Sequence, residues 1–80
     1  MATITIHYFG MLESLTGKAE DRLDIPAGWS VDQLLEHLDR QYSGLRDKCF
    51  RVAVNDAIQS GERVIDEGDR IALMPPFAGG

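Results

Sequence analysis

The chain has 80 residues, of which 44% are hydrophobic, so its apolar side chains can build one small core but not a second domain. Its net charge of −5 has the wrong sign for a surface that follows nucleic-acid phosphates, and we expect no nucleic-acid partner. The single cysteine, Cys49, excludes an internal disulfide, and no basic segment precedes a long apolar run. These features predict a soluble, cytoplasmic protein with no membrane partner.

The first third of the chain predicts two strands, which are joined either as a hairpin or through a short linker helix. Residues 3–9 alternate between apolar and polar types and are rich in β-branched side chains, which is typical of a half-buried strand. The apolar face of this strand consists of Ile4, Ile6 and Tyr8. Residues 11–15 can form about one helical turn, and residues 20–25 alternate again, which indicates a second strand.

The middle of the chain predicts the main helix, over residues 30–44. Ser30 followed by Gln33 is a capping-box pattern, and Gly44 is a typical stop. The apolar positions recur at helical spacing and are Val31, Leu34, Leu35, Leu38 and Tyr42. We expect this face to pack on the sheet, with Trp29 packing beside the start of the helix.

The remaining elements are short strands. Residues 50–54 form an apolar strand, residues 55–56 (Asn-Asp) tolerate positive φ and predict a tight turn, and residues 57–59 return. Residues 66–69 predict a solvated turn before a last strand at residues 70–74.

This order of elements predicts an α+β fold of the ubiquitin-like β-grasp type, in which one main helix crosses a mixed sheet. We assign residues 1–74 to the β-grasp domain and residues 75–80 to an extended, flexible C-terminal tail that ends in Gly-Gly.

The C-terminal tail can present a reactive group to another protein. Pro75 and Pro76 donate no amide hydrogen and favour an extended chain, so they end the sheet and direct the tail outward. At roughly 3.3 Å per residue, the tail could reach about 20 Å into another protein. Gly79 and Gly80 lack a Cβ and leave the terminal carboxylate open to reaction after adenylation. The alternative is a terminus that does nothing.

The stretch 67–80 resembles the end of the sulfur-carrying small subunits of molybdopterin synthase. Residues 8–9, 30–35 and 52–56 resemble the same family in order and spacing. The resemblance implies that an ATP-dependent adenylating enzyme activates the terminal glycine and that a sulfur donor protein converts it to a thiocarboxylate. The large synthase subunit then receives the tail, and sulfur passes to the cyclic pyranopterin precursor in molybdenum cofactor biosynthesis.

The resemblance also implies the site. Gly80 is the covalent site, Gly79 gives access to it, and the chain is a sulfur-carrying subunit with no catalytic centre of its own and no bound cofactor, since the activating partner uses the ATP. The implied partner-binding residues are Met74, Pro75, Pro76, Phe77 and Ala78. Where the family usually has arginine after the first strand, this chain has Glu13.

We expect the adenylating enzyme and the large subunit to bind overlapping surfaces at the end of the last strand, and therefore to exclude one another. The apolar part of this surface is predicted to include Leu73, Met74 and Phe77. The predicted acidic rim consists of Asp66, Glu67 and Asp69.

The histidines and the cysteine are expected to have structural roles. His7 and His37 lack partners at metal spacing and are expected to be surface residues, with no metal site, while Cys49 is expected to be a small core residue. Three alternative functions stay open: a sulfur carrier for thiazole (thiamine) synthesis, a ubiquitin-like protein modifier, and an interaction module with an inert tail.

Overall fold

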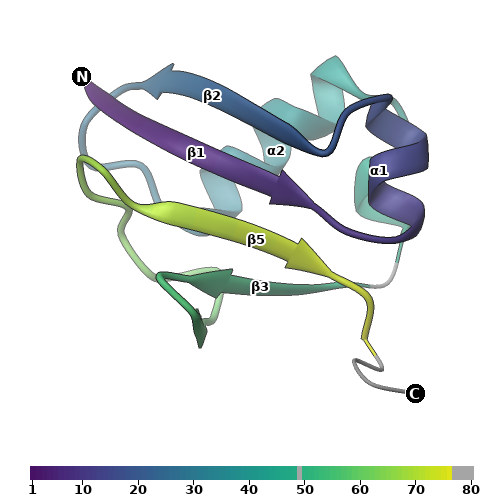
Figure 1. The fold of residues 1–80 in the computed structure, drawn as a ribbon. Coiled ribbons are helices and arrows are strands. Elements are labelled where there is room, and N and C mark those ends of the chain that lie inside the picture. The colour runs from purple at the N-terminus through teal and green to yellow at the C-terminus, as the bar shows by residue number, and fades with distance from the viewer. Residues whose placement is uncertain (49, 77–80) are drawn as a thin grey trace.

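A computed structural model describes residues 1–48 and 50–76, and its elements follow the predicted order (Figure 1). Five strands form one sheet in the order β2-β1-β5-β3-β4, in which β1 and β5 run parallel and the other neighbours antiparallel. The elements are β1 (Ala2–Tyr8), α1 (Met11–Thr16), β2 (Glu20–Ile25), α2 (Val31–Gln41), the 3₁₀ helix η1 (Leu45–Asp47), β3 (Arg51–Val54), β4 (Ala57–Ile58) and β5 (Arg70–Met74). The predicted mixed sheet with one main helix is confirmed.

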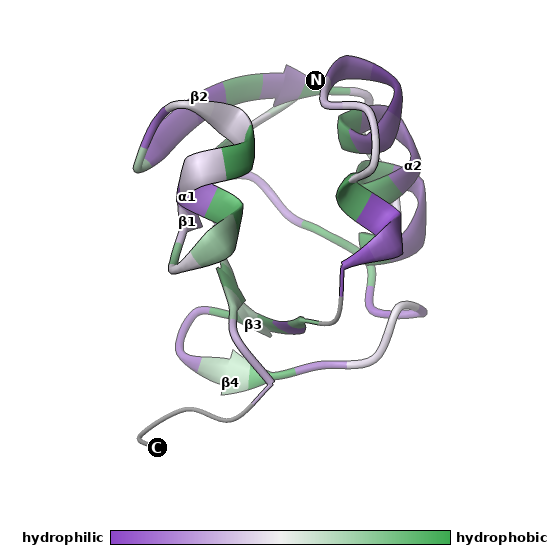
Figure 2. Ribbon diagram, turned by 90° about the vertical axis from the view of Figure 1, so that its right-hand side faces the viewer, coloured by the Kyte–Doolittle hydropathy of each residue, from purple (hydrophilic) through white to green (hydrophobic). Residues whose placement is uncertain are grey.

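The core lies between α2 and one face of the sheet. Alternate residues of β1 and β5 are buried, because successive side chains of a strand point to opposite faces. Ile6 and Ile71 are partners in the register of these two strands, and both are fully buried. From α2 the core receives Val31, Leu34, Leu35 and Leu38. Figure 2 shows the apolar residues of α2 in green on its inner side and its polar residues in purple on the opposite side.

α2 begins where the sequence predicts. The Ser30 hydroxyl accepts a hydrogen bond from the backbone N–H of Gln33 (3.3 Å), and the side-chain carbonyl of Gln33 accepts one from the N–H of Ser30 (2.9 Å). The capping box is therefore present. Trp29 packs against the core beside this cap, with its ring 5.6 Å from that of His37, as predicted for Trp29.

α2 ends earlier than the sequence predicts. Its last residue is Gln41 rather than a residue next to Gly44, because Tyr42 leaves the helical region at φ −123°. The Tyr42 hydroxyl donates to the carboxylate of Asp21 on β2 (3.3 Å), which draws this side chain toward the sheet. The 3₁₀ helix that follows was not predicted, and it buries Leu45 completely.

The turn between β3 and β4 has the predicted geometry. Asn55 and Asp56 adopt φ values of 51° and 72°, and positive φ at both central residues suits the twist of a two-residue hairpin. The short returning strand β4 follows directly. The sequence therefore predicted both the turn and its strand.

The turn before β5 is exposed at residues 66–68, as predicted, but not at Asp69. Asp69 is only 6% exposed. Its carboxylate accepts hydrogen bonds from the backbone N–H of Asp66 (2.7 Å), the side-chain amide of Asn55 (2.8 Å) and the guanidinium of Arg63 (3.2 Å). Burial opposes ionisation, but these hydrogen bonds outweigh it and hold the pKa of Asp69 below its ordinary value. Asp69 thus joins three segments of the chain.

Candidate functional site

The C-terminal segment leaves the domain from β5, the strand in the middle of the sheet (Figure 1). β5 pairs with β1 on one side and with β3 on the other. One residue before β5 ends, the carbonyl of Leu73 accepts a hydrogen bond from the backbone N–H of Phe9 (3.1 Å). The base of the segment is therefore held on a rigid part of the fold.

Pro75, the first residue after β5, lies against the turn that joins β1 to α1. Gly10 in this turn has φ 60° and ψ −130°, a conformation that disfavours an L side chain. A Cβ on Gly10 would lie 3.0 Å from Cγ of Pro75. The proline ring therefore occupies space that a side chain at position 10 would need.

Apolar side chains near Pro75 are incompletely covered. Phe9 and Met11 are 47% and 50% exposed, and Met74, Pro75 and Pro76 are half-buried. We call these five residues the exit surface. A group of exposed apolar side chains is typical of a contact with another protein.

The exit surface includes part of the predicted partner-binding set, namely Met74, Pro75 and Pro76. The other predicted site residues, Phe77, Ala78, Gly79 and Gly80, lie outside the described residues. The prediction for Leu73 is wrong: this side chain is fully buried, because the alternation of β5 turns it toward the core.

The predicted acidic rim is also wrong. Its three residues precede β5, so they lie at the opposite end of this strand from Pro75. The carboxylate of Glu67 accepts a hydrogen bond from the backbone N–H of Thr3 (3.0 Å), which places the turn beside the start of β1. Asp66 is exposed there, whereas Asp69 is buried. None of the three flanks the exit surface.

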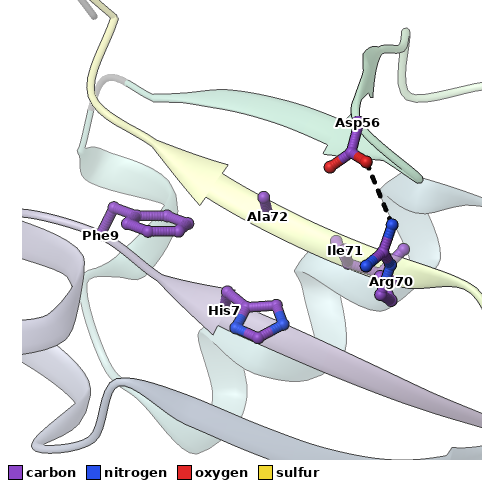
Figure 3. A pocket seen from close by; sticks show the side chains of 6 residues that line it. All are labelled: His7, Phe9, Asp56, Arg70, Ile71 and Ala72. Atoms are coloured by element: carbon purple, nitrogen blue, oxygen red, sulfur yellow. Dashed lines mark hydrogen bonds and ion pairs between the residues drawn. The ribbon is translucent and has the colours of Figure 1, made fainter.

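The outer face of the sheet is hollowed next to the exit surface (Figure 3). The depression has a volume of about 220 Å³ and lies over the small side chain of Ala72. Its lining consists of His7, Phe9, Asp56, Arg70, Ile71 and Ala72. Arg70 pairs with Asp56 (3.0 Å) toward one end, and the ring of Phe9 lies toward the other. The sequence reasoning missed Phe9 as a site residue, although continuing the alternation of β1 places it on this outer face.

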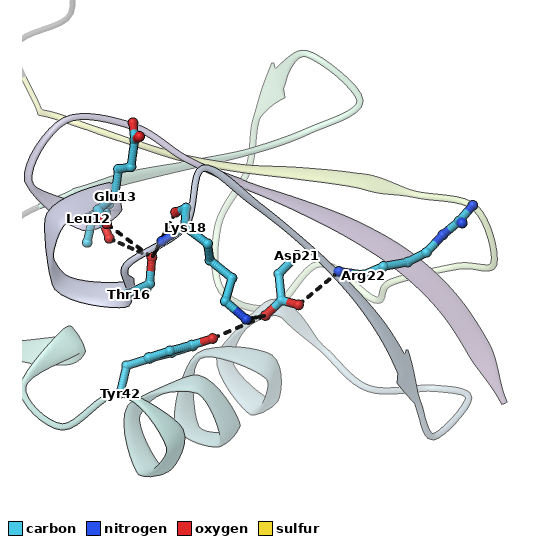
Figure 4. A network of polar contacts seen from close by, with 7 residues as sticks. All are labelled: Leu12, Glu13, Thr16, Lys18, Asp21, Arg22 and Tyr42. Atoms are coloured by element: carbon cyan, nitrogen blue, oxygen red, sulfur yellow. Dashed lines mark hydrogen bonds and ion pairs between the residues drawn. The ribbon is translucent and has the colours of Figure 1, made fainter.

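A polar network lies beside α1 (Figure 4). Asp21 accepts the hydrogen bond from Tyr42 and lies 3.8 Å from Nζ of Lys18. The neighbouring Tyr42 hydroxyl and the Asp21 carboxylate raise the pKa of Lys18. Glu13 on α1 is exposed, and Figure 4 shows its carboxylate pointing away from this network. At the position where the resemblance implied an arginine, the chain therefore presents the exposed carboxyl group of Glu13.

The histidines have local partners instead of a shared site. Nδ1 of His7 lies 3.5 Å from the Glu20 carboxylate, and His37 contacts the Trp29 ring. Within residues 1–48 and 50–76, no three His, Cys, Asp or Glu side chains form a group that could hold a metal ion. In the same ranges, no helix is long and apolar enough to cross a membrane. Cys49 lies outside the described residues, so its role in the core stays a prediction.

Comparison with known proteins decides the family, because the ThiS family model matches residues 6–80. The chain belongs to the ThiS family. A molybdopterin synthase sulfur carrier subunit from Mycobacterium tuberculosis is 34% identical, with 100% of each chain covered. A relative of the same name from Aspergillus niger is 33% identical and covers 98% of this chain and 94% of its own. The predicted resemblance to the sulfur-carrying subunits is therefore confirmed.

A solved structure has the same backbone fold. A chain named as molybdopterin converting factor subunit 1 from Pyrococcus furiosus has a TM-score of 0.89 at 22% identity, covering 96% of this chain and 100% of that one. This likeness confirms the β-grasp fold.

Proposed function

We propose that this chain is the sulfur carrier subunit of molybdopterin synthase, and that its terminal Gly80 carries sulfur as a thiocarboxylate. The observation that carries the proposal is the way the chain leaves the fold: Pro75 and Pro76 follow directly after a strand that is paired on both edges. In the sequence, Phe-Ala-Gly-Gly follows these two prolines. The names of the curated relatives support the same function.

The reactive group is the Gly80 carboxylate, which is a poor electrophile until it is activated. An adenylating partner would join AMP from ATP to this carboxylate and release pyrophosphate. A hydrosulfide equivalent from a sulfur donor protein would then attack the carbonyl carbon, and AMP would leave, so that one oxygen is replaced by sulfur. ATP is bound by the partner, and this chain needs no cofactor of its own. Gly79 has no Cβ and lets the tail pass a narrow channel.

Sulfur delivery takes place on a second subunit. The thiocarboxylate sulfur would form a C–S bond at a carbon of the pyranopterin precursor, and the bond from that carbon to an oxygen leaving group would break. Water would then hydrolyse the resulting thioester, which leaves the sulfur on the pterin as a thiolate and returns Gly80 to its carboxylate. A structure of subunits 1 and 2 of the Helicobacter pylori molybdopterin-converting factor in complex contains a chain of this fold (TM-score 0.68, 20% identity, 98% of this chain and 99% of that one covered), which supports such an assembly.

The exit surface is the contact that we propose for both partners. The adenylating enzyme and the large subunit must each receive the same tail, so each must hold the end of the sheet from which the tail leaves. Binding of the two partners is then mutually exclusive. This function also places the carrier in the cytoplasm, which supplies the ATP for adenylation.

Mass spectrometry of the chain purified from its native cell tests the proposal. A terminal thiocarboxylate, seen as the mass gained when sulfur replaces one oxygen, is the expected result. Conjugates between Gly80 and lysines of other proteins would instead indicate a modifier, and an unmodified carboxylate in cells that are making molybdenum cofactor would indicate an inert tail.

Deleting the gene is a second test. The deletion should stop molybdenum cofactor synthesis but not thiamine synthesis, and the reverse result would indicate a thiazole carrier.

A further inference from the structure

We propose that Gly10 is a positioning residue for sulfur delivery: because it has no side chain, the ring of Pro75 lies directly on the β1–α1 turn, and this contact sets the direction in which Pro75 and Pro76 leave the domain. The contact itself is a feature of the fold. Its role in delivery rests on the proposed function.

The turn that carries Gly10 is fixed on both sides of the contact. Before it, the N–H of Phe9 bonds to the carbonyl of Leu73 on β5 (3.1 Å). After it, the carbonyl of Gly10 accepts from the N–H of Glu13 (3.1 Å), and the carbonyl of Phe9 accepts from the N–H of Leu12 (3.2 Å). These hydrogen bonds hold the backbone of Gly10 on both sides of its contact with Pro75.

Pro75 needs such a support because it has no N–H with which to continue the ladder of β5. Its ring lies within 3.0 Å of the position that a Cβ on Gly10 would take, so packing replaces the missing hydrogen bond. The direction of the chain at Pro75 matters, because a change in angle there displaces the end of the tail more than its base. For an extended tail of about 20 Å, a tilt of about 10° at Pro75 would move the tip by about 3.5 Å.

Other glycines of the described chain show that positive φ alone does not explain this position. Gly17 and Gly28 have φ values of 79° and 89°, and a Cβ on either would meet no atom within 4 Å. At Gly61 a Cβ would meet Asp32, at the start of α2 rather than at the exit surface. Gly10 combines a conformation that suits glycine with contact to the residue that begins the tail.

Three variants separate the contact from backbone strain. Gly10→Ala adds a methyl group toward Pro75. Gly10→D-Ala adds it at the other α-hydrogen, and φ 60°, ψ −130° is the mirror image of an extended conformation that L residues favour, so the D residue adopts this backbone without strain. Gly17→Ala strains a left-handed position that has no neighbour within 4 Å. The chain containing D-Ala can be assembled by ligation at Cys49.

Two measurements are made on each chain. Cα–Hα residual dipolar couplings of Pro75 and Pro76, compared with those of β5, report the direction of the exit without any partner. The kcat/KM for sulfur delivery, measured with the purified partners at a temperature where each chain is folded, reports the role in function.

We expect Gly10→Ala to shift the couplings and to lower kcat/KM by roughly 10- to 100-fold, and Gly10→D-Ala and Gly17→Ala to keep native values of both. The proposal would be overturned if Gly10→Ala kept the native couplings and the native kcat/KM. It would also be overturned if Gly10→D-Ala or Gly17→Ala lost as much sulfur delivery as Gly10→Ala. If Gly10→Ala does not fold, Pro75→Ala removes the ring instead; unchanged couplings at Pro76 and unchanged delivery would then overturn it. If the native chain carries no sulfur while Gly10→Ala still shifts the couplings, the proposed function fails and the structural contact stands.

Discussion

The two ends of β5 are held by different chemistry. At its start, the buried carboxylate of Asp69 accepts three hydrogen bonds from separate segments, which ties the turns of the domain together. At its end, Pro75 has no hydrogen to donate and packs on Gly10, among apolar side chains such as Phe9 that stay partly exposed. Hydrogen bonds to a buried charge stabilise the folded chain, whereas uncovered apolar area stabilises only a complex. The hydrogen bonds that stabilise the fold and the surface that we propose for partner binding thus lie at opposite ends of one strand.

Among the changes at the two ends of β5, we expect a change in the tail to have the largest effect on sulfur delivery. Deleting Gly80 should abolish thiocarboxylate formation and sulfur delivery, because the deletion removes the reacting carboxylate from its place. No core side chain is lost, so the free energy of unfolding should stay within about 0.5 kcal/mol of the native value. Mass spectrometry after incubation with the adenylating enzyme, ATP and sulfur donor measures the first effect, and thermal denaturation the second. Full delivery by the shortened chain would contradict the role of Gly80.

A change at the start of β5 should lower stability and leave sulfur delivery unchanged. Asp69→Ala leaves the hydrogen-bond donors of Asn55, Arg63 and Asp66 without their acceptor, and should lower the free energy of unfolding at neutral pH by about 2–4 kcal/mol. Sulfur delivery per folded molecule should not change. Asp66→Ala is the matched control, because Asp66 contributes its backbone N–H to the network and that group remains. An equal loss of stability in both variants, measured by urea denaturation, would remove Asp69 from its assigned role.

A smaller effect is expected from the exit surface. Phe9→Ala should weaken the complexes with the large subunit and with the adenylating enzyme by about 1–3 kcal/mol each, if its ring is buried in both. Val64→Ala, at a half-exposed apolar residue that bridges to Ser30 before α2, should leave both affinities unchanged. Titration calorimetry gives the dissociation constants. Unchanged binding by Phe9→Ala, or binding of both partners to one chain at once, would contradict the shared surface.

The smallest effect is a dependence of stability on pH. The pKa of Asp69 is lowered in the folded chain, so its ionisation stabilises the fold above the unfolded carboxyl pKa of about 3.9, and this contribution is lost as the pH falls through the lower folded value. The gap in stability between the native chain and Asp69→Asn should therefore be constant near neutrality and narrow below roughly pH 4. Denaturation curves at several pH values measure it, and a gap that does not narrow would show that the charge contributes nothing.

Sequence reasoning succeeded where the signal is local. The alternation of residues 3–9, the capping box of Ser30 and the positive φ at Asn55 each depend on neighbours within a few positions, and all three are present. The burial of Asp69 could not be read in the same way, because its partners include Asn55 and Arg63, which reach it only once the sheet has formed.

In the candidate site, too, local features could be predicted from the sequence, whereas contacts between distant residues could not. The composition of the tail indicates its chemistry, because prolines, glycines and a terminal carboxylate have properties that do not depend on the fold. The contact that directs the tail joins Gly10 to Pro75, which are far apart in the sequence and meet because β1 and β5 lie side by side. Pairing of parallel strands is not encoded in any short segment, and so this contact was visible only in the structure.

The most direct test of the central claim follows one sulfur atom. The chain is loaded with radioactive sulfur at Gly80, freed of the activating enzyme and the sulfur donor, and mixed with the large subunit and the pyranopterin precursor. We expect the label to leave the chain and to appear in the pterin product, while Gly80 returns to an ordinary carboxylate. A labelled chain that keeps its sulfur while unlabelled product forms would contradict it.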